Sequence, residues 1–189
     1  MTQDPTLKTS RLELIPSGAD HAPQLWRWMS DPELTRYLAW APHVDAEETR
    51  TVLRAMQEAH AQGLAYHWTV FSDNDACGVV SLIDVRRRHR LWELQRAEIA
   101  YWVASAFQGR GIATEAVVAV IESAFTSLGF NRLVISHTTE NVASGRIPRR
   151  LGFRYIGQEQ QFFRKAGVWF DMNHYELLRD DWLRRRGVA

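Results

Sequence analysis

The sequence predicts a mixed α/β (α+β) domain, and three observations support that class. Segments rich in β-branched and aromatic residues alternate with segments whose apolar residues recur at helical spacing. One strand-like segment, Ala97–Val103, leads through a glycine-containing loop into one long apolar helix, Thr114–Phe125. The chain of 189 residues is long enough for one domain with a substantial core. We therefore expect a single domain over residues 1–189, with its core at about 8–178 and a C-terminal tail at 179–189.

The N-terminal half is predicted to contain one strand, then three helices, then a pair of strands. Arg11–Ile15 alternates between polar and apolar residues, as a half-buried strand does. Asp31 before a proline, and Asp45 three residues before Glu48, are signals that helices begin there. The predicted helices are Ala19–Met29, Pro32 to about Tyr37, and Ala46–Gln62, and the strands after them are Ala65–Phe71 and Cys77–Val85, joined by a hairpin turn at Ser72–Asp75.

The C-terminal half completes an element order of β-αα(α)-ββ-β-α-β-α-ββ. A basic connection, Arg86–Trp92, is expected to lead into the central strand. The elements expected after the long apolar helix are a strand at Arg132–Ser136, a helix from Asn141 to Leu151, and two last strands at Phe153–Phe163 and Val168–Leu178.

Composition and charge argue against several classes of protein, namely nucleic-acid-binding, membrane-spanning, disulfide-bonded and metal-binding proteins. A net charge of +1 gives no bulk attraction to nucleic acid, and we expect the run Arg86–Arg90 to be a solvated hairpin, with RNA binding as the least favoured role. Cys77, the only cysteine, cannot form an intrachain disulfide and is expected in the core. The N-terminus is polar, no run approaches the ~18 apolar residues of a membrane span, and the histidines lack metal-ligand spacing. We therefore expect a cytoplasmic protein without a metal.

The central loop, Gln108–Ala113, has the composition of an anion-binding site. The first N–H groups of a helix have no intrahelical acceptor and carry partial positive charge. Two glycines let that backbone approach a phosphate, and Arg110 adds a cation. The loop is not G-x-x-x-x-G-K-[ST], which excludes a Walker-type site, and it is not G-x-G-x-x-G, which disfavours a Rossmann site. It matches Q/R-x-x-G-x-G/A, although by itself this motif would also suit an ordinary strand-to-helix turn.

Further segments, in the same order, make the chain similar to one family. With the loop, they resemble the GNAT superfamily of acyl-CoA N-acyltransferases, in its RimJ/RimL-type branch of ribosomal-protein N-terminal acetyltransferases. The resemblance extends from about Lys8 to Leu178 and implies a central, mostly antiparallel, splayed sheet flanked by helices. The segments are Thr9–Leu14, Leu38–Pro42, Ala97–Trp102, Asn141–Arg146 and Arg150–Phe153.

The resemblance implies which residues hold acetyl-CoA. Backbone N–H groups of the loop would bind the diphosphate, and the strand before the loop would pair with the pantetheine arm and offer an N–H to the thioester oxygen. Asn141 would bond the pantetheine arm, cap its helix, or do both. Arg146 would contact a phosphate or be solvated. The implied cofactor-binding residues are Tyr101, Trp102, Val103, Gln108, Gly109, Arg110, Gly111, Ile112, Ala113, Thr114, Asn141 and Arg146.

The resemblance also gives candidates for the proton transfers. Ser144 matches the serine of Asn-x-x-Ser that lies near the sulfur and could protonate the leaving thiolate, the alternative being an ordinary first-turn serine. Pro148 stands where many members carry a tyrosine, and it could kink or delay the helix. Ungapped counting places the branch glutamate at Phe163, and Glu159 would fit only with a bulge. Glu98, on the cofactor-facing strand, is the other candidate base, acting through water, unless it is a structural partner of an arginine.

The acceptor is expected to be a primary amine. An α-amine, with a pKa of about 7.7–8.0, is partly neutral at neutral pH, whereas a lysine side chain, at about 10.4, is not. Without an evident strong base, the pattern favours direct attack by the α-amine of a protein, such as a ribosomal protein. The alternatives are a small-molecule amine (polyamine, amino acid or antibiotic) and a CoA-binding module that has lost catalysis. The expected partners are acetyl-CoA and the acceptor, with no membrane; nucleic acid is disfavoured, and a homodimer is left open.

Overall fold

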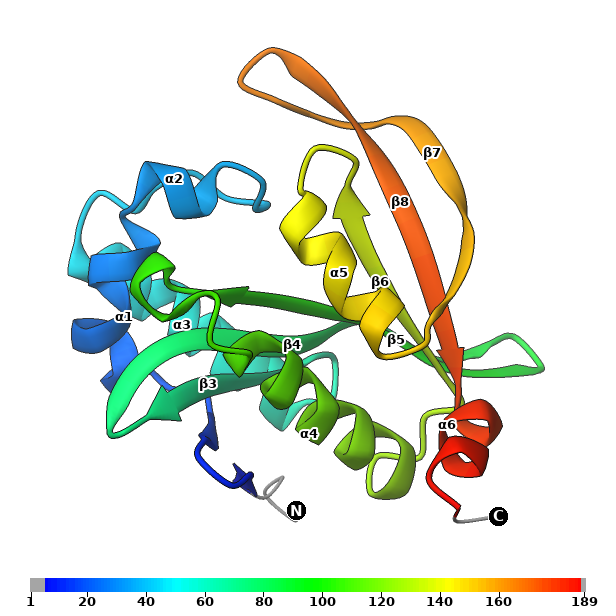
Figure 1. Ribbon diagram of the computed structural model, residues 1–189. Helices are drawn as coiled ribbons and strands as arrows, with labels where there is room; N and C mark the ends of the chain where they lie inside the picture. Colours follow the sequence, from blue (N-terminus) through cyan, green and yellow to red (C-terminus); the bar gives the residue numbers. More distant parts are fainter. Residues whose placement is uncertain (1–5, 188–189) are drawn as a thin grey trace. The chain divides into compact units, whose positions relative to one another are not determined.

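The computed structural model describes residues 6–187 (Figure 1). Within that range it has eight strands, six α-helices and two 3-10 turns. The strands are β1 Leu7–Lys8, β2 Glu13–Pro16, β3 Tyr66–Ser72, β4 Asp75–His89, β5 Trp92–Val103, β6 Arg132–Thr138, β7 Arg154–Lys165 and β8 Val168–Leu178. The helices are η1 Ala19–His21, α1 Ala22–Met29, α2 Pro32–Thr35, α3 Ala46–Ala61, η2 Ser105–Phe107, α4 Ile112–Thr126, α5 Val142–Arg150 and α6 Arg179–Arg185.

Contacts along the chain divide it into two compact units. The first runs to Ile83 and includes Tyr101–Val120, and the second contains Asp84–Ala100 and the chain from Ile121. Strands β4 and β5 and helix α4 each run from one unit into the other. Hydrogen bonds order the strands as β1-β2-β3-β4-β5-β6-β8-β7. The pair β5–β6 is parallel, and the pairs β1–β2, β2–β3, β3–β4, β6–β8 and β7–β8 are antiparallel. This mixed, mostly antiparallel sheet confirms the predicted fold class.

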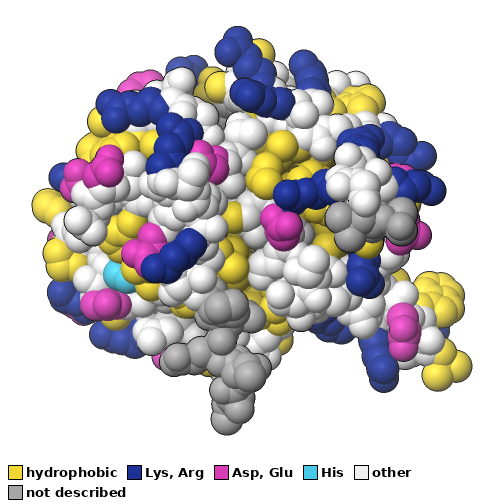
Figure 2. All heavy atoms as spheres, turned by 60° about the horizontal axis from the view of Figure 1, so that its bottom comes forward, with side chains coloured by type: hydrophobic (Ala, Val, Ile, Leu, Met, Phe, Trp, Pro, Cys, Tyr) yellow, Lys and Arg dark blue, Asp and Glu magenta, His cyan; other side chains and the backbone are white. Residues whose placement is uncertain are grey.

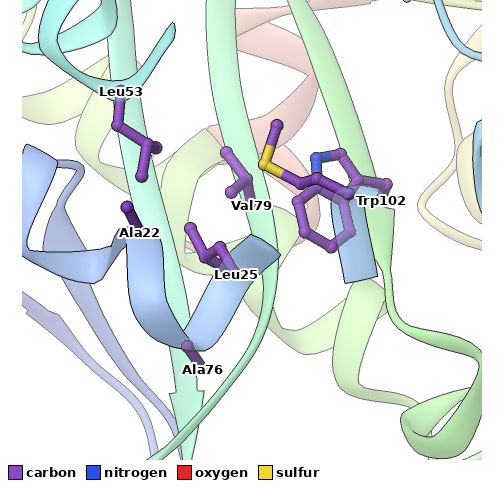
Figure 3. Close-up of a cluster of buried hydrophobic side chains, with 7 residues drawn as sticks. Ala22, Leu25, Leu53, Ala76, Val79 and Trp102 are labelled. Atoms are coloured by element: carbon purple, nitrogen blue, oxygen red, sulfur yellow. The ribbon is translucent and has the colours of Figure 1, made fainter. Parts of the chain in front are cut away.

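The first unit combines antiparallel strands with helices α1 and α3, which pack against each other. Strand β2 pairs with β3, and β3 pairs with β4. Trp68 on β3 lies opposite Val80 on β4 and is fully buried. Asp45 caps the start of helix α3, because its carboxylate accepts the Glu48 N–H at 2.8 Å, as the sequence predicts. The buried cluster of this unit (Figure 3) contains Ala22, Leu25, Met29, Leu53, Ala76, Val79 and Trp102.

The second unit contains the strand order β5-β6-β8-β7, with α5 packed against β6 (Figure 1). The parallel pairing of β5 with β6 ends at Glu98 and Val134, although β6 continues beside β8 to Thr138. Strand β7 has two register shifts, the second of them between Glu159 and Phe163. That irregularity lies where the alignment of Glu159 with the branch glutamate requires a bulge.

We expected the basic segment Arg86–Trp92 to be a connection between strands. That prediction is wrong, because most of the segment continues strand β4. The turn falls at Arg90 and Leu91, and β5 already begins at Trp92. Arg87 explains the longer strand, because its guanidinium lies 3.9 Å from the centre of the Phe130 ring and donates to a backbone carbonyl at 2.7 Å. The predicted solvated hairpin tip is present, because Leu91 at that tip is 98% exposed.

The C-terminal segment expected as a tail forms helix α6 up to Arg185. Trp182 buries its ring, and Arg185 Nη1 donates to the Gly152 carbonyl at 2.7 Å. The Arg185 hydrogen bond joins residues 33 positions apart in the chain, so local sequence patterns do not reveal it. The short strand β1 was also not predicted.

Charges of both signs are mixed on the face of the molecule that Figure 2 draws. Figure 2 shows Lys and Arg side chains interleaved with Asp and Glu side chains on the face it draws, in keeping with the net charge of +1. Among the described residues, no helix is both long and apolar enough to cross a membrane.

Candidate active site

The predicted anion loop joins β5 to α4 as a short, exposed turn. The Gln108 side chain donates to the Val103 carbonyl at 2.9 Å and thereby ties the loop to the strand end. Gly109 and Gly111 have φ angles of 75° and 78°, in the left-handed region that favours glycine. The Gly111 carbonyl accepts the Glu115 N–H at 3.0 Å, so the helical hydrogen bonding of α4 begins at this glycine.

The loop combines exposed residues with the first N–H groups of a helix. Ile112–Thr114 form the first turn of α4, whose N–H groups have no carbonyl partners within the helix. A Cβ built on Gly109 would meet no atom within 4 Å. The Arg110 guanidinium lies 5.5 Å from the centre of the Phe107 ring, which holds a positive charge beside the loop. This combination of amides, helix dipole, cation and space fits a diphosphate.

The segment Thr9–Arg11 is bonded to the loop and to the first turn of α4. The Thr9 hydroxyl donates to one Glu115 oxygen at 2.5 Å, and Arg11 Nε donates to the other at 2.7 Å. Arg11 Nη2 donates to the Arg110 carbonyl at 2.7 Å. Burial raises the pKa of Glu115, but the hydrogen bonds from Thr9 and Arg11 outweigh burial and hold that pKa below its usual value. Glu115 is therefore ionised at neutral pH.

The strand end before the loop offers its backbone rather than its largest side chain. The Trp102 ring belongs to the buried cluster of the first unit (Figure 3). A Cβ on Gly78 would lie 2.4 Å from the Trp102 carbonyl oxygen, so glycine permits a close approach of the two strands here. Val103 is also buried, and Tyr101 is half-buried. Any contact of Trp102 with a cofactor therefore has to use main-chain atoms, as the resemblance implied.

Helix α5, in the second unit, has Asn141 as its N-cap residue. The Asn141 side-chain oxygen accepts the Ser144 N–H at 3.1 Å, so the predicted N-cap is confirmed. Pro148 lies inside the helix, buried, and the helix still starts at Val142. The delayed start that Pro148 suggested is therefore absent. Ser144 is half-buried in the first turn, and Arg146 is exposed.

Gly145 sets how closely α5 approaches β6. A Cβ on Gly145 would lie 2.6 Å from both Cε1 and Nε2 of His137. His137 is buried and its Nδ1 donates to the Thr138 carbonyl at 2.7 Å, which fixes the ring. Burial lowers the pKa of His137, so the ring is neutral at neutral pH. The glycine next to Ser144 thus holds the serine's helix against the sheet.

Glu98 begins a row of polar side chains that crosses four neighbouring strands. The Ser136 hydroxyl hydrogen-bonds Glu98 and lies 2.9 Å from His174 Nδ1. His174 Nε2 lies 3.6 Å from a carboxylate oxygen of Glu159. The four residues belong to β5, β6, β8 and β7, in the order of the sheet.

Burial raises the pKa of Glu98 above its ordinary value, and Asp84 raises it further. The Ser136 hydrogen bond and the charges of His174 and Arg96 act in the opposite direction. Arg96 itself pairs with Asp84 at 3.0 Å. A carboxyl group with a raised pKa accepts a proton more readily than an ordinary one, which suits a general base.

The predicted site residues thus fall into two groups. Tyr101–Val103 and Gln108–Thr114 follow one another along β5, the loop and α4 in the first unit. The second unit holds Glu98, on β5, and three residues at the start of α5, which are Asn141, Ser144 and Arg146.

Sequence reasoning did not assign a site role to Ser136, Arg11 or Glu115, and it considered His174 only as a residue of the core or rim that could line the amine pocket. Ser136 and His174 face each other only because β6 and β8 pair in a particular register. Arg11 and Glu115 lie 104 positions apart in the chain. The only available signal was that Arg11 belongs to a segment resembling the family. Across residues 6–187, no group of three or more His, Cys, Asp or Glu side chains could hold a metal ion.

A family model described as "Acetyltransferase (GNAT) domain" matches residues 11–154, which includes the loop and the start of α5. The chain belongs to this family. The GNAT chain is 30% identical over 152 residues to the putative ribosomal N-acetyltransferase YdaF of Bacillus subtilis, covering 79% of this chain and 80% of that one. It is 29% identical over 180 residues to the ribosomal-protein-serine acetyltransferase of Escherichia coli, covering 93% and 97%.

A solved GNAT structure with coenzyme A has a similar fold. It is RimL, named a ribosomal L7/L12 α-N-protein acetyltransferase, and it superposes with a TM-score of 0.85 at 27% identity, covering 94% of this chain and 98% of that one. These relatives confirm the predicted family, its RimJ/RimL-like character and its acetyltransferase activity. That RimL structure is a complex with coenzyme A.

Proposed function

We propose that this GNAT enzyme transfers an acetyl group from acetyl-CoA to the N-terminal α-amine of a protein in the cytoplasm, with a ribosomal protein as the leading acceptor. The observation that carries the proposal is the likeness to RimL in complex with coenzyme A, which covers nearly all of both chains. The E. coli relative is likewise named for a ribosomal protein.

The chain has groups suited to each part of the cosubstrate. Backbone N–H groups from Gly109 to Thr114 bind the diphosphate, assisted by Arg110. Main-chain atoms of Tyr101–Val103 pair with the pantetheine arm, and one N–H polarises the thioester carbonyl. Asn141 uses its oxygen as the helix cap, which leaves its amide N–H groups for the arm. Arg146 is exposed and contributes a positive charge for phosphate.

The reaction needs two proton transfers around one substitution. The neutral amine nitrogen forms a bond to the thioester carbon, and the carbon–sulfur bond then breaks, with no acyl-enzyme in between. Glu98 takes the proton lost by the ammonium group, through water, and its raised pKa suits that role. The Ser144 hydroxyl donates its proton to the leaving thiolate, and the second proton, which the nitrogen releases as the amide forms, restores the serine hydroxyl. An α-amine does not need a strong base, because its pKa of about 7.7–8.0 leaves it partly neutral at pH 7.

Two matched peptides and a panel of small amines test the proposal. One peptide has a free α-amine and blocked lysines, and the other has a blocked α-amine and free lysines. With acetyl-CoA and the purified protein, we expect one acetyl group by intact mass on the first peptide only, together with release of CoA thiol. The same assay is then run on intact ribosomal proteins. Acetylation confined to lysine or to small amines would overturn the choice of acceptor, and CoA binding without thiol release on any amine would indicate a non-catalytic module.

A further inference from the structure

One arginine near the start of the chain bonds the anion loop and the first turn of α4 at once. Arg11 Nε donates to Glu115 Oε2 at 2.7 Å, and Arg11 Nη2 donates to the Arg110 carbonyl at 2.7 Å. The Thr9 hydroxyl holds the other Glu115 oxygen at 2.5 Å. A Cβ on Gly111 would lie 3.4 Å from Arg11 Nη2, so the glycine packs directly on the guanidinium. All of these contacts lie within the first unit.

The Arg110 carbonyl has a defined direction because of this contact, and so has the next N–H group. A trans peptide is planar, and its C=O and N–H bonds point in opposite directions. When Arg11 holds the Arg110 oxygen on one side, the Gly111 N–H is directed to the other side. This control matters because Gly111 lies at one end of this peptide and would otherwise let it rotate readily.

Charge gives Arg11 a second effect on the loop. Glu115 lies in the first turn of α4, and its lowered pKa keeps it ionised at neutral pH. A carboxylate there suits the helix dipole, but it would repel a diphosphate bound at the same helix end. The Arg11 guanidinium pairs with that carboxylate and reduces the repulsion. A lysine cannot bond a carboxylate and a carbonyl with one rigid planar group.

We propose that Arg11 is a positioning residue of the coenzyme A loop, which aims the Gly111 N–H at the diphosphate and neutralises Glu115. The inference rests on the proposed function, because it assumes that the loop holds the diphosphate. Arg11 itself binds the protein rather than the cosubstrate. Its loss therefore weakens binding of the diphosphate portion without removing a group from the acceptor side.

Calorimetric titration of the full chain with coenzyme A tests the proposal. We expect Arg11→Gln to raise the Kd for coenzyme A roughly 10- to 100-fold, since an oriented charge-assisted hydrogen bond is lost. Arg11→Lys should fall between this variant and the wild type. The control is Arg50→Gln, which removes the same charge from an exposed pair with Glu47 on α3. It should bind as the wild type does.

Two further arms separate positioning from a loss of folding. The fragment 3′-phospho-ADP carries the diphosphate without pantetheine, and its Kd should rise by the same factor as that of coenzyme A. In Arg11→Gln/Glu115→Gln the unpaired carboxylate is gone, so affinity should recover in part but not fully, because the carbonyl anchor is still missing. If Arg11→Gln does not fold, the titration of Arg11→Lys decides the question.

The outcomes distinguish this inference from the proposed function. A wild-type protein that binds neither coenzyme A nor 3′-phospho-ADP would contradict the proposed function. A wild-type protein that binds both, with folded Arg11 variants that bind equally well, would overturn the role of Arg11 alone. Full recovery in the double variant would also overturn the orienting role and leave only the charge effect.

Discussion

Replacing Gly109 by alanine tests the loop with little steric ambiguity. Gly109 has a φ of 75°, and an added Cβ meets no atom within 4 Å, so strain is the only local cost in the free protein. A non-glycine residue in this region costs about 1–2 kcal/mol, partly offset by about 0.4–1 kcal/mol from the stiffer unfolded chain. A net loss of about 1 kcal/mol should lower the Tm by about 2–4 °C for a chain of this size.

The effect on binding should be much larger than the effect on stability. The new methyl group would stand on the exposed side of the loop, where the diphosphate approaches. Losing one or two amide bonds to a charged group, worth about 1.5–3 kcal/mol each, raises the Kd for coenzyme A at least roughly tenfold.

Gly129→Ala is the matched control for this experiment. Gly129 has a φ of 69° and also has no atom within 4 Å of an added Cβ, but it follows the C-terminal end of α4. Thermal denaturation should show the same loss of stability in both variants, and calorimetry should show weaker binding only for Gly109→Ala. Equal Kd values for coenzyme A in both variants would refute the assignment of the loop.

Three other predictions concern single side chains. Ser144→Ala should lower kcat by about 100-fold, the scale of general acid catalysis, with the Kd for coenzyme A unchanged; a kcat equal to that of the wild type would exclude this serine as the acid. Ser136→Ala removes a hydrogen bond that favours ionised Glu98, so the pKa of Glu98 should rise and activity should fall on the acid side of the pH–rate profile only. Burial lowers the pKa of His67 to about 4, with a smaller contribution from His60. Because an unfolded histidine binds its proton near pH 6.5, the free energy of unfolding should fall by up to about 3 kcal/mol between pH 6.5 and 4, and His67→Gln should flatten that slope in urea titrations.

Much of the fold could be predicted from local patterns. Capping signals placed the starts of α3 and α5 correctly, because Asp45 and Asn141 bond N–H groups three residues away. The loop also formed where two glycines precede an apolar helix, since positive φ angles are inexpensive only for glycine. The errors occurred where distant contacts decide the outcome, as for the Arg87 strand and for helix α6.

The candidate site divides in the same way. Gly109, Gly111 and Ser144 are recognisable in sequence because a short motif carries their chemistry. The surroundings of Glu98 are not, since Ser136 and His174 meet only through the pairing of β6 with β8. The register of β7 against β8 shifts just after Glu159, whose carboxylate lies near His174. The sequence does not reveal this shift either, because a bulge depends on the partner strand.

The sequence by itself determined the family, most of the order of the elements and the position of the glycine loop, because helix caps, glycine conformations and apolar periodicity act over a few neighbouring residues. Only the tertiary structure decided which side chains tune that chemistry. Arg11 reaches the Arg110 carbonyl, and Ser136 reaches Glu98, through strand pairing and packing. Such contacts depend on the position of segments far apart in the chain, and local sequence patterns carry no information about that position.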